Sequence, residues 1–262
     1  MAEVERAWKL VRRIVREADI VLEVLDARDP YATRCRKLEE YVRRIGKRLI
    51  LVINKVDLIP KEVAEEWKRI FSREFPTIFI SAKDRLGTRF LWRTIKLYAP
   101  KIPVKVAVVG YPNVGKSMII NILKGRHAAG TSPIPGYTKH AMLVKASRAI
   151  KVIDTPGVIP LDEGEEELII KGALRPEALE DPIPPAIKLI RYILDRDPRT
   201  FEKIYGIESK DPGAILRELA KKRGLLKKGG ELNIEEAARI IIRDWQTGKI
   251  KCYSKPEHYG LR

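Results

Sequence analysis

The chain has 262 residues, of which 45% are hydrophobic and 33% charged, so it can fill hydrophobic cores and is not a disordered protein. Lysine and arginine outnumber aspartate and glutamate by 52 to 35, and the net charge of +17 predicts a polyanionic partner bound through phosphate contacts. The alternative is a densely charged, heat-adapted surface. No apolar run reaches the length of a membrane span, and the charged N-terminus lacks a signal-peptide core. We therefore expect a cytoplasmic protein without membrane contact; we also expect a monomer.

Helix and strand patterns alternate in the first part of the chain. Apolar residues at helical spacing predict a helix over 2–19, followed by a strand over 20–25 that ends in an Asp-Ala-Arg-Asp-Pro turn. A basic helix is expected over 32–48, either as a solvated face or as a phosphate-binding one. The run 49–53 is too apolar to alternate, which predicts a parallel strand covered on both sides. A helix, a strand and a helix are then expected over 61–73, 77–80 and 87–98.

A polar tetrapeptide, Asn54-Lys-Val-Asp57, follows the carboxyl end of the second strand, where α/β sheets place ligands. The Asp57 carboxylate can accept two hydrogen bonds from guanine, a pairing that adenine cannot supply. Asn54 is expected to tie neighbouring loops together, and the Lys55 stem to cover the base. Taken alone, the tetrapeptide can also be a plain turn.

A tripeptide, Ser81-Ala82-Lys83, lies one helix and one strand later. By itself it is weak evidence. Its position after the tetrapeptide makes Ser81, Ala82 and Lys83 candidates for a second guanine contact, made through the Ala82 backbone N–H.

The strongest signal is a phosphate-binding loop, Gly110-Tyr-Pro-Asn-Val-Gly-Lys-Ser117, between an apolar strand pattern over 104–109 and a helical pattern. Its glycines let the backbone N–H groups point inward, Lys116 reaches the β- and γ-phosphates, and the Ser117 hydroxyl is placed to hold magnesium. The N-terminus of the helix adds its positive end. The loop predicts binding of a nucleoside triphosphate. The residues expected to contact it here are Gly110, Pro112, Asn113, Val114, Gly115, Lys116 and Ser117.

Two further motifs follow the phosphate loop. Thr138 ends a stretch rich in turn formers and is the natural partner of Ser117 on magnesium. A hairpin of two strands is expected over 141–153, and it ends in Asp-Thr-Pro-Gly. Asp154 can hold magnesium through water, and the Gly157 N–H can sense a γ-phosphate, which together form a switch that relaxes on hydrolysis.

These five motifs resemble the signatures of GTPases in a rotated order, because the guanine motifs precede the phosphate loop. The set resembles the circularly permuted GTPases of the YlqF/RbgA ribosome-assembly type, as do the DARDP turn, the PGYT segment and the DWQTGKI tail. The resemblance implies an α/β P-loop GTPase domain over 1–164 with a circularly permuted, six-stranded, mostly parallel sheet. Its strands should lie in the spatial order fifth, sixth, fourth, first, second, third, with the fifth antiparallel.

The resemblance also implies the function: a GTP-binding and GTP-hydrolysing switch that uses Mg²⁺ and assists assembly of the large ribosomal subunit by binding rRNA or pre-ribosomes in its GTP state. The ribosomal target comes from the resemblance and not from any residue. The alternative is a nucleotide-gated RNA-binding module whose hydrolysis is incidental.

Hydrolysis is expected to be slow and partner-stimulated, because Val158 stands where many GTPases carry the glutamine that orients water. Asn113 matches the asparagine with which potassium-activated GTPases hold K⁺; alternatively it only supports the loop. The bacterial Trp-Phe-Pro-Gly-His-Met stretch has no counterpart in Met1–Leu10, so the role of its histidine is not carried over. The expected catalytic residues are Asn113, Lys116, Thr138 and Gly157.

Residues 165–262 should form a small all-α domain that contacts RNA, with helices at about 165–174, 185–194, 212–222 and 234–245. Residues 1–164 hold 32 basic and 18 acidic residues, against 20 and 17 in the rest, so the charge excess lies in the GTPase part. One basic cluster in the tail either contacts RNA or is a solvated loop. Its members are Lys221, Lys222, Arg223, Lys227 and Lys228.

Overall fold

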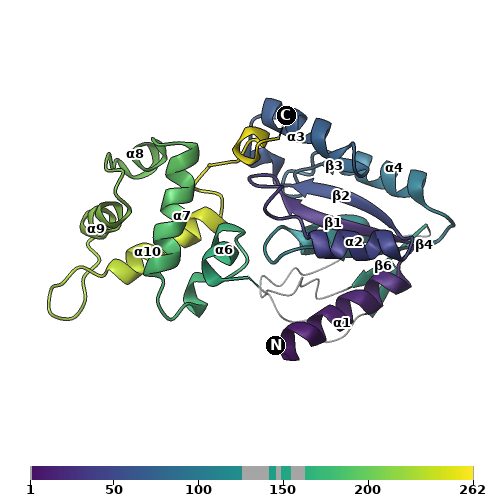
Figure 1. The fold of residues 1–262 in the computed structure, drawn as a ribbon, viewed down its shortest axis with the longest axis horizontal. Coiled ribbons are helices and arrows are strands. Elements are labelled where there is room, and N and C mark those ends of the chain that lie inside the picture. The colour runs from purple at the N-terminus through teal and green to yellow at the C-terminus, as the bar shows by residue number, and fades with distance from the viewer. Residues whose placement is uncertain (1, 126–141, 146–148, 155–162, 262) are drawn as a thin grey trace. The chain divides into compact units, whose positions relative to one another are not determined.

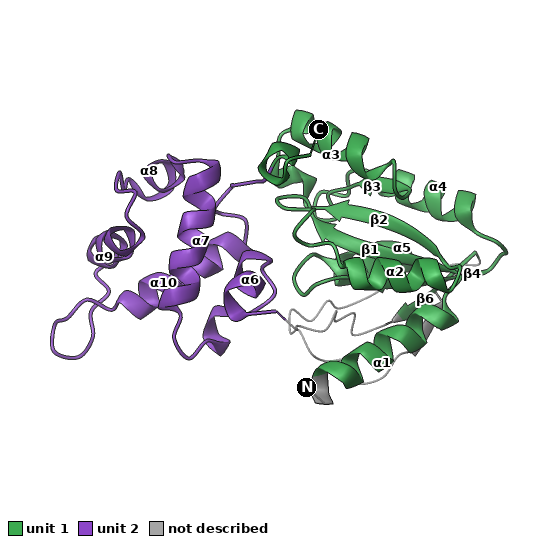
Figure 2. Ribbon diagram, in the orientation of Figure 1, with its two compact units in different colours: residues 1–162, 255–262 green, residues 163–254 purple. Residues whose placement is uncertain are grey.

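The computed structural model describes residues 2–125, 142–145, 149–154 and 163–261 (Figure 1). The chain forms two compact units: unit 1 comprises Met1–Asp162 and Lys255–Arg262, and unit 2 comprises Glu163–Ser254 (Figure 2). The division expected from the sequence places everything after residue 164 in the second domain. The structure differs in its last eight residues, which belong to unit 1.

Unit 1 is built on a six-stranded sheet with strand order β3-β2-β1-β4-β6-β5. Only β5 is antiparallel to its neighbour. This confirms the circularly permuted sheet and its predicted strand order. Every residue of the central strand β1 is buried, as expected for a strand covered on both faces. The strands are β1 Ile20–Asp26, β2 Arg48–Asn54, β3 Thr77–Phe79, β4 Val104–Val109, β5 Met142–Lys145 and β6 Ile150–Asp154.

The helices of unit 1 follow the predicted order, and Figure 1 shows α1 and α2 together over one face of the sheet. They are α1 Ala2–Glu17, α2 Arg36–Arg44, α3 Lys61–Phe71, α4 Thr88–Tyr98 and α5 Lys116–Lys124, with a 3₁₀ turn at Val56–Leu58.

Helix α2 is much shorter than the helix expected over 32–48. Before it, the Asp29 side chain accepts a hydrogen bond from the Ala32 N–H at 3.0 Å, which keeps this segment in a turn. After it, Gly46 has a φ of +67°, and the Lys47 N–H bonds the Val42 carbonyl at 3.0 Å, a left-handed helix end. The expectation was wrong because helical spacing of apolar residues continues through both turns.

Unit 2 is all helical, as predicted. Its core is a single cluster of buried apolar side chains in which Trp245 donates its Nε1–H to the Ile170 carbonyl at 3.0 Å. The short helix α8 was not predicted. Across the described residues, no helix is both long and apolar enough to cross a membrane. The helices are α6 Glu165–Ile170, α7 Ile183–Arg196, α8 Thr200–Tyr205, α9 Pro212–Lys222 and α10 Ile234–Gln246, with a 3₁₀ turn at Pro176–Ala178.

The C-terminal segment packs on unit 1 through a 3₁₀ turn, Pro256–Tyr259. The Tyr259 hydroxyl donates to Asp29 Oδ2 at 2.6 Å. Its ring lies 4.4 Å from that of Tyr31 and 6.2 Å from that of Trp67, measured between centroids. The end of the chain therefore holds the DARDP turn and α3 from outside, a contact over 230 positions that the sequence did not indicate.

Candidate guanine-nucleotide site

The loop Gly110–Ser117 joins β4 to α5, as the motif requires. Gly110 and Gly115 have φ angles of +149° and +101°, which side chains rarely adopt. A Cβ at Gly110 would lie 2.5 Å from the Val24 carbonyl oxygen, and one at Gly115 only 2.1 Å from Asn54 Nδ2. The loop is thus pressed against β1 and β2. Asn113, also left-handed with a φ of +61°, sits at a position that asparagine tolerates better than most residues.

Lys116 is the first residue of α5 and the central cation of the loop. Its Nζ donates to the Tyr111 carbonyl, and among the described residues it forms no ion pair with a carboxylate. Burial, and then the neighbouring charge of Lys55, lower the pKa of Lys116 to about 7. Lys116 is half-buried, and a partly desolvated cation without a carboxylate partner is costly unless an anion binds beside it. Ser117, the next residue, is exposed.

Asn54 joins the three loops at this edge of the sheet. Its Nδ2 donates to the Val114 carbonyl at 2.9 Å, and its Oδ1 accepts from the Ala82 N–H at 2.9 Å. Segments 60 and 28 positions away are thereby drawn to the end of β2. The Ala82 N–H, expected on guanine, is already engaged here, so a base oxygen would have to share it with Asn54.

Asp57 is exposed, and its Oδ1 accepts a hydrogen bond from the Ser81 hydroxyl at 2.7 Å. Ser81 is fully buried, so its hydroxyl holds the Oδ1 atom of Asp57 from the interior of the protein. Within the described residues Asp57 Oδ2 makes no hydrogen bond and is open to a ligand. Lys83 is exposed beside them. The two guanine motifs are thus placed together, with one serine positioning the acid.

A buried charge cluster supports Lys55, and sequence reasoning missed it. Asp26, at the end of β1, accepts from Lys55 Nζ at 2.7 Å and from Arg28 Nη2 and Nε at 2.8 and 3.0 Å. Burial alone would raise the pKa of Asp26, but Arg28 and Lys55 hold that pKa below its usual range. Burial lowers the pKa of Lys55, and Asp26 opposes that shift. The signal was available: DARDP follows an apolar strand at the same sheet edge as the guanine tetrapeptide.

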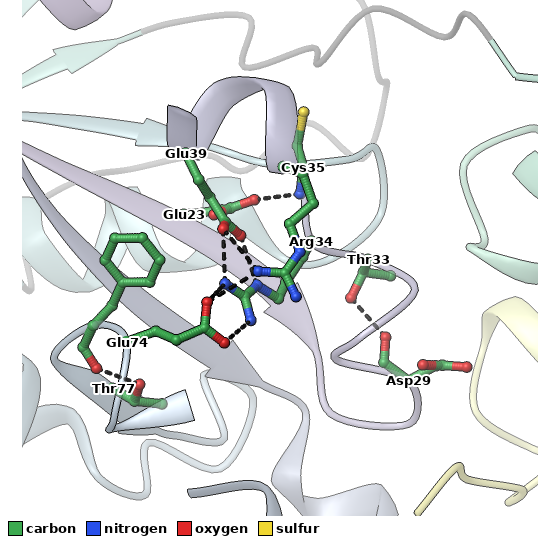
Figure 3. Close-up of polar contacts among 10 residues, drawn as sticks. Glu23, Asp29, Thr33, Arg34, Cys35, Glu39, Glu74 and Thr77 are labelled. Atoms are coloured by element: carbon green, nitrogen blue, oxygen red, sulfur yellow. Dashed lines mark hydrogen bonds and ion pairs between the residues drawn. The ribbon is translucent and has the colours of Figure 1, made fainter. Parts of the chain in front are cut away.

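A second charge cluster, centred on the buried Arg34, stabilises the segment between the DARDP turn and α2 (Figure 3). Arg34 donates to both oxygens of Glu39 at 2.6 and 2.7 Å and to both of Glu74 at 3.0 and 2.8 Å. Glu23 on β1 accepts from the Cys35 N–H at 2.7 Å at the start of α2. Burial and then the charge of Glu39 raise the pKa of Glu23. This cluster fixes the loop between β1 and α2 to Glu74, in the segment that follows α3.

Other predicted residues are described only in part. Thr138 and Gly157, with Val158, lie outside the described residues, and for Asp154 the structure describes the backbone at the end of β6. Ser117 is therefore the predicted magnesium ligand whose side chain is described. In the tail cluster, Lys222 donates to the carbonyls of Tyr205 and Gly206, and Lys227 pairs with Glu235 at 2.9 Å. Two of its five cations thus have partners within unit 2.

Two family models match successive parts of the chain. Residues 105–217 match the family model described as "50S ribosome-binding GTPase", and residues 8–101 match "Elongation factor Tu GTP binding domain". The crystal structure of GNP-bound YlqF from T. maritima is 28% identical, covers 96% of this chain and 99% of its own, and superimposes with a TM-score of 0.70. The chain belongs to the circularly permuted GTPases of the YlqF/RbgA type.

Relatives of this permuted GTPase are longer proteins. A GTP-binding protein of Methanocaldococcus jannaschii is 43% identical, and the match covers 94% of this chain and 66% of the relative. Nucleolar GTP-binding protein 2 of Neurospora crassa is 35% identical over 95% of this chain, which spans 42% of that relative. The matches therefore cover nearly all of this chain but only part of the length of these relatives.

Proposed function

We propose that the chain is a GTP-dependent assembly factor of the large ribosomal subunit. It binds GTP with Mg²⁺, attaches to rRNA in that state and leaves after hydrolysis. It acts as a cytoplasmic monomer, with residues 1–164 as the GTPase domain and the helical part as a further RNA-contacting domain. The names of relatives support the ribosomal assignment, since one family model is described as ribosome-binding and one relative as nucleolar.

One observation carries the nucleotide assignment: the half-buried Lys116 lacks a carboxylate partner among the described residues, in a loop where close packing requires glycine at two positions. Guanine is favoured over adenine by Asp57, whose Oδ2 is open while Ser81 fixes Oδ1. A hydroxyl at the start of α5 suits Mg²⁺, which prefers oxygen ligands. The ligands proposed are Ser117, Thr138 and Asp154, and the bound ion would neutralise phosphate charge.

Turnover is proposed to be slow without a partner, because the residue after DTPG is valine. K⁺ bound beside Asn113 is part of this proposal, and loop support by Asn113 is the alternative. The left-handed backbone of Asn113 already accounts for an asparagine at this position, so loop support alone explains the residue.

The deciding experiment is co-sedimentation with purified large and small subunits under GTP, GDP and a non-hydrolysable GTP analogue. We expect binding to large subunits with GTP or the analogue and release with GDP. Turnover should rise at least tenfold when large subunits are added, and further in KCl than in NaCl. Equal binding to large subunits with GTP and with GDP, or stronger binding to small subunits than to large ones, would contradict the proposal.

The second candidate, an RNA-binding module with incidental hydrolysis, rests on the same motifs. It predicts GTP-dependent binding without subunit-stimulated turnover. If large subunits hold the protein equally well after single-turnover hydrolysis, this second function replaces the first.

Base choice is expected to depend on Asp57. Asp57→Asn removes the negative acceptor, so GTP affinity should fall by about 1–3 kcal/mol while xanthosine triphosphate gains affinity. Titration with fluorescent analogues of both nucleotides measures this exchange. Asp84→Asn is the matched control, since Asp84 Oδ2 also lies 3.1 Å from the Ser81 hydroxyl but outside the tetrapeptide. Equal affinity of the unmodified protein for GTP and ATP would contradict the assignment.

A further inference from the structure

Helices α1 and α2 form one continuous outer face on unit 1. Lys37 Nζ lies 5.0 Å from the centroid of the Trp8 ring, and Lys47 Nζ donates to the Ala18 carbonyl at 2.7 Å. Both contacts join residues 29 positions apart, so the two helices run side by side in the same direction. Figure 1 shows them over the same face of the sheet.

The exposed side chains of this face are strongly basic. Eight exposed cations stand against three exposed carboxylates, counting the described side chains of α1 and α2. One of the two acids of α2 adds nothing to this face, because Glu39 is 3% exposed and is bound by Arg34. The cations are Arg6, Lys9, Arg13, Arg16, Arg36, Lys37, Arg43 and Arg44; the carboxylates are Glu5, Glu17 and Glu40.

Few of these cations are neutralised by carboxylates in the described part of the chain. Lys9 is 3.7 Å from Glu5, and Arg36 contacts the carboxylates of Glu39 and Glu74 that Arg34 also binds. In unit 2, by contrast, cations lie directly on carboxylates, for example Arg243 on Glu177 at 2.8 Å and Lys249 on Asp244 at 2.6 Å. Heat adaptation explains paired charges. It does not explain five arginines without a carboxylate partner among the described residues: Arg6, Arg13, Arg16, Arg43 and Arg44.

The chemistry of the face selects phosphates rather than an apolar partner. The large hydrophobic side chains exposed in the described part of the chain all lie on other segments, from Leu86 onward. Protein interfaces need an apolar core, and membrane-binding helices need an apolar face. Arginine forks bind phosphate oxygens in two-pronged contacts and carry their charge at any physiological pH. A sugar-phosphate backbone supplies such acceptors repeatedly over the length of two helices.

We propose that the outer face of α1 and α2, from Arg6 to Arg16 and from Arg36 to Arg44, binds the phosphate backbone of RNA. This rests on the proposed function, since it names the surface by which the protein holds rRNA. The contacts are to phosphates and carry no base specificity. The main RNA contact is thereby placed on the GTPase unit, and not on the tail cluster, where Lys222 and Lys227 already have partners.

The test compares two triple variants with the same loss of charge. Arg13→Gln, Arg16→Gln and Arg44→Gln alter the α1–α2 face; Lys221→Gln, Arg223→Gln and Lys228→Gln alter the tail cluster. Glutamine has a helix propensity close to that of arginine and lysine, and none of the six residues belongs to the nucleotide site. The probe is a fluorescent transcript of large-subunit rRNA, titrated at several salt concentrations. GTP affinity and circular dichroism check that each variant is folded.

For the α1–α2 variant, the slope of log affinity against log salt should become shallower by about 2 to 3, since each phosphate contact contributes roughly 0.7 to 0.9. The control variant should keep the slope of the unmodified protein within about 0.5. Equal changes in both variants would show that only net charge matters and would overturn the proposal. A loss of binding to phosphatidylserine vesicles without a loss for rRNA would overturn it in favour of a membrane.

The experiment distinguishes an error in the proposed RNA-binding surface from an error in the proposed ribosomal function. If the unmodified protein binds the transcript and the α1–α2 variant keeps its slope, only the surface is refuted. If the unmodified protein binds no rRNA at any salt concentration, the ribosomal function is refuted together with the surface.

Discussion

Lys116→Ala should lower the affinity for GTP by at least about 100-fold, close to the 3 kcal/mol reached by charge-assisted hydrogen bonds. The same change should leave the ligand-free protein at least as stable as before. Lys116 forms no ion pair with a carboxylate among the described residues, so its removal strands no buried anion. Calorimetric titration measures the first effect, and denaturant unfolding without nucleotide measures the second.

The same lysine should couple nucleotide binding to protons. With a pKa of about 7 before binding, most Lys116 side chains are neutral at pH 8, and bound phosphates favour the charged form. Binding at pH 8 should therefore take up close to one proton, and affinity should fall as the pH rises above about 7. Calorimetry in two buffers of different ionisation enthalpy counts the protons.

Lys116→Arg is the control for this linkage, because arginine stays charged throughout this range. Its binding should show no proton uptake at pH 8, even if its affinity is lower. Normal GTP binding by Lys116→Ala, or the same proton count for the unmodified protein and Lys116→Arg, would remove Lys116 from the phosphate site.

The features that the sequence predicted well are either local motifs or consequences of the order of the strands. The phosphate loop and the guanine motifs each occupy a few consecutive residues, and parallel strands bring their carboxyl ends to one edge. Their rotated order then implied the spatial order of the six strands, which the structure confirms. Asn54 is placed between Val114 and Ala82 by that same geometry.

What the sequence did not show depends on contacts between distant segments. The link from Tyr259 to Asp29 crosses 230 positions, and nothing in either local pattern indicates it. The bond from Lys55 to Asp26 joins the ends of β1 and β2, where Asp26 stands opposite Asn54 in the sheet. In the sequence, Asp26 begins a proline turn, where an acid is usually exposed to solvent. In the structure Asp26 is buried, and it binds the ammonium of Lys55 in the predicted guanine motif.

Asp26→Asn is therefore expected to be among the most damaging single changes in unit 1. Asp26 is 4% exposed and carries the negative charge shared by Lys55 and Arg28. Asparagine keeps the shape but leaves the buried Arg28 and the partly buried Lys55 without their anion, a loss of about 3–5 kcal/mol in the free energy of unfolding. Denaturant unfolding of the ligand-free protein measures it. Asp84→Asn, the same change at an exposed site, should cost less than about 0.5 kcal/mol.

A double substitution separates lost charge from lost shape. If the damage comes from stranded cations, Asp26→Asn combined with Lys55→Met should be more stable than the sum of the single changes implies, because one stranded cation is gone. The expected coupling is about 1–3 kcal/mol, the range for residues in direct contact. Additive effects would mean that Asp26 stabilises its turn alone and does not hold Lys55. Guanine affinity should not recover in the double variant even where stability does, because the methionine lacks the ammonium that Asp26 holds at the site.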